Sequence, residues 1–251
     1  MASRAEQKAR TRNALIHSWL RLIGDGANFA SVSLREVAKT AGVVPTSFYR
    51  HFGDMDELGL AVVDQLGSDL RRLGRLSQDP DTPVSASVQQ GVAAFAEYVT
   101  ENADLVRFVN QARTGGNSPL RKAIDNELEF FSARIASALG DVRPELDTAA
   151  RDLVAELVIA VLLESTPAML EADAEQLVEA RSSLEQKIRV VLLGAAQLAD
   201  DSQPPKLRKR TPARTTGGRA TKATSARKAT SKGTDAKKSA NRARKPAGGP
   251  A

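Results

Sequence analysis

Apolar residues recur at helical spacing along most of the chain, up to about Leu198. In a first predicted helix, Arg4–Gly24, residues Leu15, Trp19 and Ile23 fall on one face. The same spacing predicts further helices at about Val84–Glu101, Asp104–Arg113, Pro119–Leu139, Leu146–Leu170 and Ala174–Leu198. No segment alternates apolar and polar residues convincingly, so the predicted fold class is all-α.

Start and stop signals indicate several short helices near the N-terminus. Ser33 and Glu36 have the spacing of a capping box at the start of a second helix. Gly42 is expected to end that helix, because glycine alone adopts a left-handed backbone at little cost. Pro45 is compatible with the first turn of a third helix, and Asp54 is placed to cap a fourth.

The charge of the chain is divided unevenly. From Ser202 to Ala251 there are 15 Lys and Arg and one acidic residue, Asp235, whereas the rest has 21 basic and 29 acidic residues. The basic segment has almost nothing to bury, so we predict that it is disordered. We therefore divide the chain into a small N-terminal helical domain (1–53), a larger helical domain (54–200) and a basic tail (201–251).

Residue usage argues against several classes of function. The absence of cysteine excludes disulfides, thiolate metal sites and a cysteine nucleophile. The two histidines, His17 and His51, lie on different predicted helices, and no serine has a G-x-S-x-G context, so we expect neither a metal site nor a catalytic site. No apolar stretch follows the basic N-terminus, and the longest apolar run, Leu157–Leu163, is too short for a membrane span. We expect a cytoplasmic, non-enzymatic protein without a cofactor.

The strongest local signal is the stretch SLREVAKTAGVVPTSFYRHF, which has the pattern of a helix-turn-helix. This motif needs a small residue where the helices cross, a turn former and an apolar docking residue, and Ala38, Gly42 and Phe48 have these roles at suitable spacing. The second helix must present polar groups to the major groove of DNA. An ordinary pair of packed helices is the alternative. The candidate DNA-binding residues are Ser33 at the cap, with Pro45, Thr46, Ser47, Tyr49, Arg50 and His51.

Residues from about Arg4 to Leu198 resemble the TetR family of bacterial regulators. FASVSLREVAKTAGVVPTSFYRHFGDMDELG and QARTGGNSPLRKAI look especially like the subgroup that represses unsaturated fatty-acid synthesis genes, the FabR type. The resemblance implies a homodimer whose first three helices bind palindromic operator DNA and whose last two helices, about 146–198, form a four-helix interface. Many members have a phosphate-contacting lysine after the cap of the fourth helix. Met55 takes that position here, so Lys8, Arg10 or Arg12 are candidates to replace the contact.

The resemblance also implies an effector site in the larger domain. This subgroup senses long-chain acyl thioesters, so an acyl-CoA-type effector is expected between the predicted helices from Val84 to Leu139. The candidate ligand-binding residues are Phe95, Tyr98, Val99, Phe108, Arg113 and Phe131. For each aromatic or aliphatic residue the simpler interpretation is core packing, and for the arginine it is surface solvation.

The apolar faces of the last two predicted helices indicate an interface. We expect Leu153, Leu157, Leu184, Ile188 and Val191 in a two-fold contact between protomers. The predicted function is a ligand-responsive repressor of lipid genes. The alternative is a nucleoid-associated protein that coats DNA through its basic tail. A third hypothesis, a helical acyltransferase or hydrolase, is disfavoured because the sequence has no set of residues suited to catalysis. The tail is either a solubilising extension or a sequence-blind DNA arm.

Overall fold

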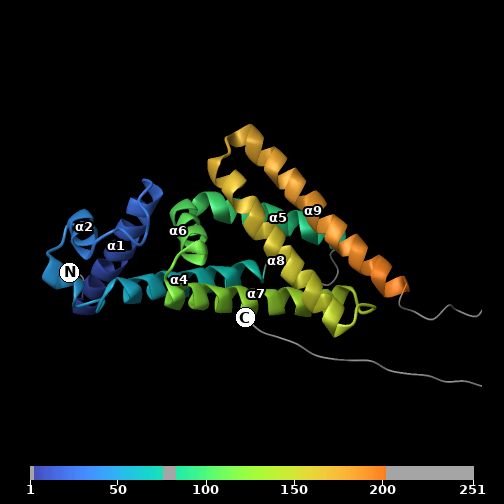
Figure 1. The fold of residues 1–251 in the computed structure, drawn as a ribbon, viewed down its shortest axis with the longest axis horizontal. Coiled ribbons are helices and arrows are strands. Elements are labelled where there is room, and N and C mark those ends of the chain that lie inside the picture. The colour runs from blue at the N-terminus through green and yellow to red at the C-terminus, as the bar shows by residue number, and fades with distance from the viewer. Residues whose placement is uncertain (1–2, 76–82, 202–251) are drawn as a thin grey trace, which may run out of the picture. The chain divides into compact units, whose positions relative to one another are not determined.

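The computed structural model describes residues 3–75 and 83–201, with side chains up to Gln197. This part of the chain is helical throughout and has no strand, which confirms the all-α prediction (Figure 1). The basic tail and its predicted disorder lie outside the described residues. The helices are α1 (Arg4–Gly24), α2 (Leu34–Thr40), α3 (Pro45–Phe48), α4 (Met55–Leu73), α5 (Val84–Glu101), α6 (Ala103–Thr114), α7 (Ser118–Val142), α8 (Thr148–Glu171) and α9 (Ala174–Asp201).

Caps fix the limits of the N-terminal helices. Ser33 and Glu36 form the predicted capping box at the start of α2. The Asp54 carboxylate accepts a hydrogen bond from the Glu57 backbone N–H at 2.8 Å and caps α4. Gly42 has a φ of +69° in the turn between α2 and α3, as the sequence predicted. These local signals set the short helices in the order that a helix-turn-helix requires.

The N-terminal helices share their core with α6 and α7. Leu15 and Trp19 of α1 and Phe48 of α3 pack in one apolar cluster with Phe108 of α6 and Leu120 of α7. The described residues therefore form one compact unit, and packing does not break at the division of 53 from 54 that the sequence indicated. That division stays a functional prediction.

A close parallel contact joins α4 to α7, which run side by side in Figure 1. Three glycines of α4 face α7 about two turns apart. A Cβ on Gly59 would lie 2.8 Å from a Leu120 methyl carbon, one on Gly67 2.2 Å from a Glu127 carboxylate oxygen, and one on Gly74 3.0 Å from Arg134 Nε. A larger residue at any of these positions would require the facing side chain of α7 to shift, and we call this contact the glycine seam.

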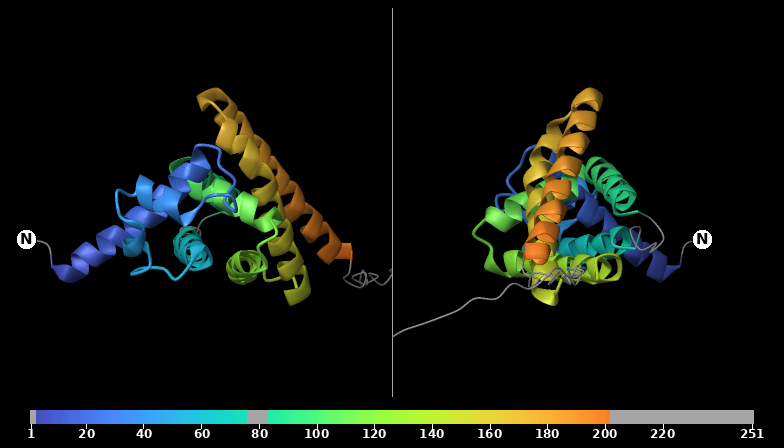
Figure 2. Two further views of the ribbon diagram at one scale, coloured as in Figure 1. Left: turned by 60° about the vertical axis from the view of Figure 1, so that its left-hand side comes forward. Right: turned by 90° about the vertical axis from the view of Figure 1, so that its right-hand side faces the viewer.

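The last two helices, α8 and α9, pair in antiparallel fashion and also pack on α5 and α7 (Figure 2). Among the described residues, α8 is the one helix whose length and composition would suit a membrane span. It packs instead against α5, α7 and α9, and its buried face contributes Val154, Val158 and Leu162 to the second apolar cluster of the protein. Only 39% of its apolar window is buried, so contacts within the protomer account for part of its hydropathy.

The predicted interface residues do not share one surface. Leu184 and Ile188 of α9 are buried inside the protomer, so their assignment to a contact between protomers was wrong. Helix α9 has apolar residues on two sides. The side with Leu184 and Ile188 packs against α8 and α5 in the core of the protomer. The exposed apolar residues of the two helices include the predicted Leu153 and Leu157 of α8, together with Val178, Val190 and Leu193 of α9.

Candidate nucleic-acid interface and cavity

The third helix presents polar side chains because two aromatic residues hold its other side. Phe48 and Phe52 are buried and lie 5.6 Å apart between ring centroids. Helix α3 starts at Pro45, as expected for a residue whose fixed φ suits the first turn. This docking leaves Thr46 and Arg50 exposed. The geometry fits insertion of α3 into the major groove.

The other predicted DNA-binding residues of the motif differ in their exposure and hydrogen bonds. Tyr49 is exposed and packs edge-on against Phe48, whereas Ser47 is half-buried. The Ser33 hydroxyl accepts a hydrogen bond from the Glu36 N–H at 3.3 Å. The Ser33 hydroxyl and backbone N–H donate to the Glu36 carboxylate at 2.7 Å and 2.8 Å, and these two bonds lower the pKa of Glu36. Ser33 is therefore occupied in the cap of α2, and a DNA contact by any of these residues stays a prediction.

A cluster of positive charge surrounds His51 where α1 meets α3. Burial lowers the pKa of His51, and the neighbouring cations Lys8, Arg12 and Arg50 lower it further. The guanidinium of Arg12 lies 4.9 Å from the centre of the Phe52 ring, a cation–π distance that fixes this side chain at the edge of α3. The arrangement supports the prediction that α1 supplies the phosphate contact that Met55 cannot make.

The second candidate site is an apolar cavity of about 200 Å³ in the larger helical body. It lies between the end of α4 and helices α5, α7, α8 and α9. A smaller cavity of about 50 Å³ continues toward the middle of α4 and α6. Phe95, Phe131 and Leu162 line both cavities, so the two spaces adjoin at these side chains.

The structure brings four of the predicted ligand residues to these cavities. Phe95 and Phe131 line both, and Tyr98 and Val99 line the smaller one. The assignment of Phe108 needs correction, because it packs 5.1 Å from the Trp19 ring in the N-terminal core. Arg113, at the end of α6, also lines neither cavity. Ligand binding by the four others stays a prediction.

Sequence reasoning missed Arg134, the only charged side chain among the described residues that line the larger cavity. Its Nε is buried and has no hydrogen-bond partner. The signal was present in the sequence, since Phe131, Ile135, Ala138 and Leu139 form an apolar helical face in which Arg134 is the one cation.

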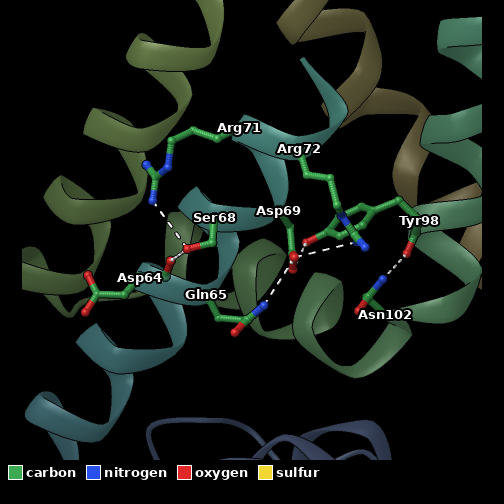
Figure 3. Close-up of polar contacts among 8 residues, drawn as sticks. All are labelled: Asp64, Gln65, Ser68, Asp69, Arg71, Arg72, Tyr98 and Asn102. Carbon is green, nitrogen blue, oxygen red and sulfur yellow. Dashed lines mark hydrogen bonds and ion pairs between the residues drawn. The ribbon is translucent and has the colours of Figure 1, made fainter. Parts of the chain in front are cut away.

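Buried polar contacts join α4 to α5 beside the smaller cavity. The Tyr98 hydroxyl donates to the Asp69 carboxylate at 3.4 Å, and Gln65 donates to the same carboxylate at 3.2 Å. Figure 3 shows these groups converging on Asp69, together with Arg72, whose guanidinium lies 3.7 Å from the carboxylate. Burial and the nearby carboxylate both raise the pKa of Tyr98, so its phenol is a hydrogen-bond donor at neutral pH. A ligand against Tyr98 would therefore act on α4.

The chemistry of a metal or a reaction centre is not evident in the described part of the chain, which has no cluster of His, Asp and Glu side chains suited to a metal ion. The exposed helix-turn-helix and the basic cluster beside it are typical of another class of protein, the DNA-binding regulator.

Comparison with known proteins agrees with this class. Residues 22–62 match the model of the bacterial regulatory proteins of the tetR family. The match covers the helix-turn-helix, so this segment of the chain is similar to the DNA-binding part of TetR-family transcriptional regulators. No assignment to the FabR-type subgroup follows from this match.

Solved structures with the same fold include two fatty-acid regulators. FadR from Bacillus halodurans is 16% identical, with a TM-score of 0.59 over 73% of this chain and 95% of its own. FadR from Bacillus subtilis in complex with stearoyl-CoA is 15% identical, with a TM-score of 0.57 over 70% of this chain and 96% of its own. A tetR-family regulator from Streptomyces coelicolor is 18% identical, with a TM-score of 0.61 over 80% of this chain and 86% of its own.

Proposed function

We propose that the protein is a homodimeric repressor that binds palindromic operator DNA, and that acyl thioesters control its binding to genes of fatty-acid or lipid metabolism. The observation that carries the proposal is an apolar cavity at the end of α4, the helix whose other end adjoins α3. A ligand in this cavity contacts the element that positions the DNA-binding helix.

The exposed apolar surface of α8 and α9 supports a dimer. Leu153 and Leu157 are one helical turn apart on α8, and Val190 and Leu193 are nearly so on α9. Two copies of this surface would form a four-helix contact of the isologous kind. Paired protomers would hold two copies of α3 at a fixed separation, which must match one turn of B-DNA, about 34 Å, for both to enter the major groove.

The apolar lining supports a lipid effector. Apart from Arg134, the side chains at the larger cavity are apolar or small, and the smaller cavity extends this space past Phe95 and Phe131. The FadR structure with stearoyl-CoA shows that the same fold holds a long-chain acyl thioester. An effector changes DNA affinity only if it binds the DNA-competent and incompetent states unequally.

Two measurements test the proposal. Sequencing of genomic fragments bound by the purified dimer should return a few palindromic sites near lipid genes, and broad coverage would favour the DNA-coating alternative. Acyl-CoA species of different lengths and saturation are then titrated against the selected operator. Unchanged operator affinity with every species would refute the effector part of the proposal, and Arg50→Ala serves as the control that weakens DNA binding alone.

A further inference from the structure

The end of helix α4 and the larger cavity meet at one cation. Arg134 of α7 lines the cavity, and its NH2 group donates to the Gly74 carbonyl at 3.5 Å. That distance is longer than the 2.7–3.2 Å of a well-formed bond. The Nε group is buried without any partner. Arginine has five N–H donors, so this side chain retains unused capacity beside an apolar space.

We propose that Arg134 is the specificity residue of the effector site, and that it selects a ligand with an anionic head on an unbranched apolar chain. This inference rests on the proposed function, since it names the chemistry of the effector. In the described part of the chain no carboxylate lines the cavity. A ligand carboxylate or phosphate therefore has no acidic competitor there for the guanidinium.

The cavities have room for a matching chain. An engineered cavity of about 150 Å³ holds benzene, so about 200 Å³ and 50 Å³ together hold on the order of ten non-hydrogen atoms. With the head at Arg134, the chain passes Phe95 and Phe131 and ends in the smaller cavity against Tyr98. Decanoate is the simplest probe of this size and charge.

The same cation couples the ligand to α4. Gly74 is the C-cap of α4, and carbonyl groups at a helix C-terminus attract cations. An anion binds a guanidinium more strongly than a neutral carbonyl does. The ligand therefore draws Arg134 from Gly74 and removes a contact at the end of the glycine seam between α4 and α7, which leaves α4 free to shift.

Calorimetric titration of the full-length protein tests the inference with decanoate, 1-decanol and decanoyl-CoA below their micelle concentrations. We expect the wild type to bind decanoate about 10- to 100-fold more tightly than 1-decanol, the factor that a charged hydrogen bond contributes. Arg134→Gln should remove that preference by lowering the affinity for decanoate much more than the affinity for 1-decanol. Arg71→Gln is the matched control, because Arg71 pairs with Glu127 of α7 at 3.0 Å but lines neither cavity.

The comparison of ligands on the wild type needs no variant, so a folding defect in Arg134→Gln cannot decide the result. Equal affinities for decanoate and 1-decanol on the wild type would overturn the inference. The inference would also be overturned if Arg134→Gln still bound decanoate more tightly than 1-decanol. If the inference is overturned in this way but acyl-CoA still changes operator affinity, the proposed function stands. Whichever of decanoate and decanoyl-CoA binds more tightly identifies the effector as a free acid or a thioester. The affinity for both ligands must fall in Arg134→Gln.

Discussion

The side-chain carbonyl of Gln111, in α6, accepts a hydrogen bond from the backbone N–H of Phe29 at 2.9 Å. The Gln111 amide nitrogen donates a second hydrogen bond to the Ala27 carbonyl at 3.4 Å. One side chain therefore binds a backbone N–H and a backbone carbonyl of the segment between α1 and α2. This segment leads directly into the helix-turn-helix. The contact therefore ties the segment that precedes the helix-turn-helix to α6.

Replacement of Gln111 by Leu should weaken that attachment. The Phe29 N–H would lose its partner in a half-buried position, at a cost of about 1–3 kcal/mol in the free energy of unfolding. We expect the effector-induced change in operator affinity to shrink as well. Denaturant unfolding and operator titrations measure both effects. Thr114→Val is the control, because the Thr114 hydroxyl bonds only to carbonyls of its own helix, and an unchanged response in Gln111→Leu would contradict the coupling role.

We expect Arg50, an exposed side chain two residues beyond the end of α3, to read a base. Arg50→Ala should cost about 1–3 kcal/mol of binding free energy and relax the preference at one position of each half-site. Lys8→Ala, on α1, should instead weaken binding to all sequences and lower the salt slope by about one. Binding to a library of operator variants separates the two patterns. Uniform weakening by Arg50→Ala would make it a phosphate contact, and no loss would exclude both roles.

The protomer and dimer surfaces of α9 can be separated by mutation. Leu193 is exposed, so Leu193→Asp should leave the protomer folded but place an unpaired charge in the proposed dimer contact. Leu184 is buried in the protomer, and Leu184→Ala should cost about 2–5 kcal/mol of stability with no direct effect on association. Analytical ultracentrifugation and thermal unfolding distinguish these outcomes. A dimeric Leu193→Asp variant would argue against this interface.

His51 should give DNA binding and stability opposite responses to pH. Its pKa in the folded protein is lowered from 6.5, so the unfolded chain binds more protons and stability falls as pH drops through about 6.5. DNA phosphates near Lys8, Arg12 and Arg50 would offset the charges that lower this pKa. DNA binding should then be accompanied by uptake of a proton. Operator affinity should therefore rise as the pH falls through the same range, by at most about tenfold per pH unit.

His51→Gln should flatten both pH profiles, whereas His17→Gln should leave them as in the wild type, because His17 is exposed on α1. Operator titrations and chemical unfolding between about pH 5.5 and 8 supply the two curves. A wild-type operator affinity that is level over this range would contradict proton uptake by His51.

The basic tail has a measurable consequence even though it lies outside the described residues. Its 15 Lys and Arg follow a body with 21 basic and 29 acidic residues. Each phosphate contact adds about 0.9 to the salt slope of log affinity. A chain ending at Asp201 should therefore show a slope smaller by several units on operator and on random duplex alike. Equal slopes would exclude a DNA arm, and a loss confined to the operator would indicate sequence reading.

Local signals predicted the helices well, but not the partners of their side chains. The capping box at Ser33 and the turn at Gly42 depend on neighbouring residues, so the sequence was sufficient for both. Helix α9 has apolar residues on two sides, and periodicity does not say whether Leu184 or Leu193 faces the protomer core. Only the packing of α8 and α5 decides it.

The same limit applies to the candidate sites. Phe108 has the spacing of a pocket residue, but its partners Trp19 and Phe29 are distant in the sequence. Arg134 is one arginine among many until the fold places it beside Gly74. The buried and exposed positions of the helix-turn-helix were easier to predict, because it is a local motif with a fixed pattern.

Trp19 has a practical consequence of its own. It is the only tryptophan in the chain, and it packs 5.1 Å from Phe108 in the core where the DNA-binding helices meet α6. The unlabelled protein therefore has its one tryptophan fluorophore at that junction, which can be excited selectively over the two tyrosines. Its emission can be followed in real time as effector or DNA is added, without a dye that would disturb the surface being studied.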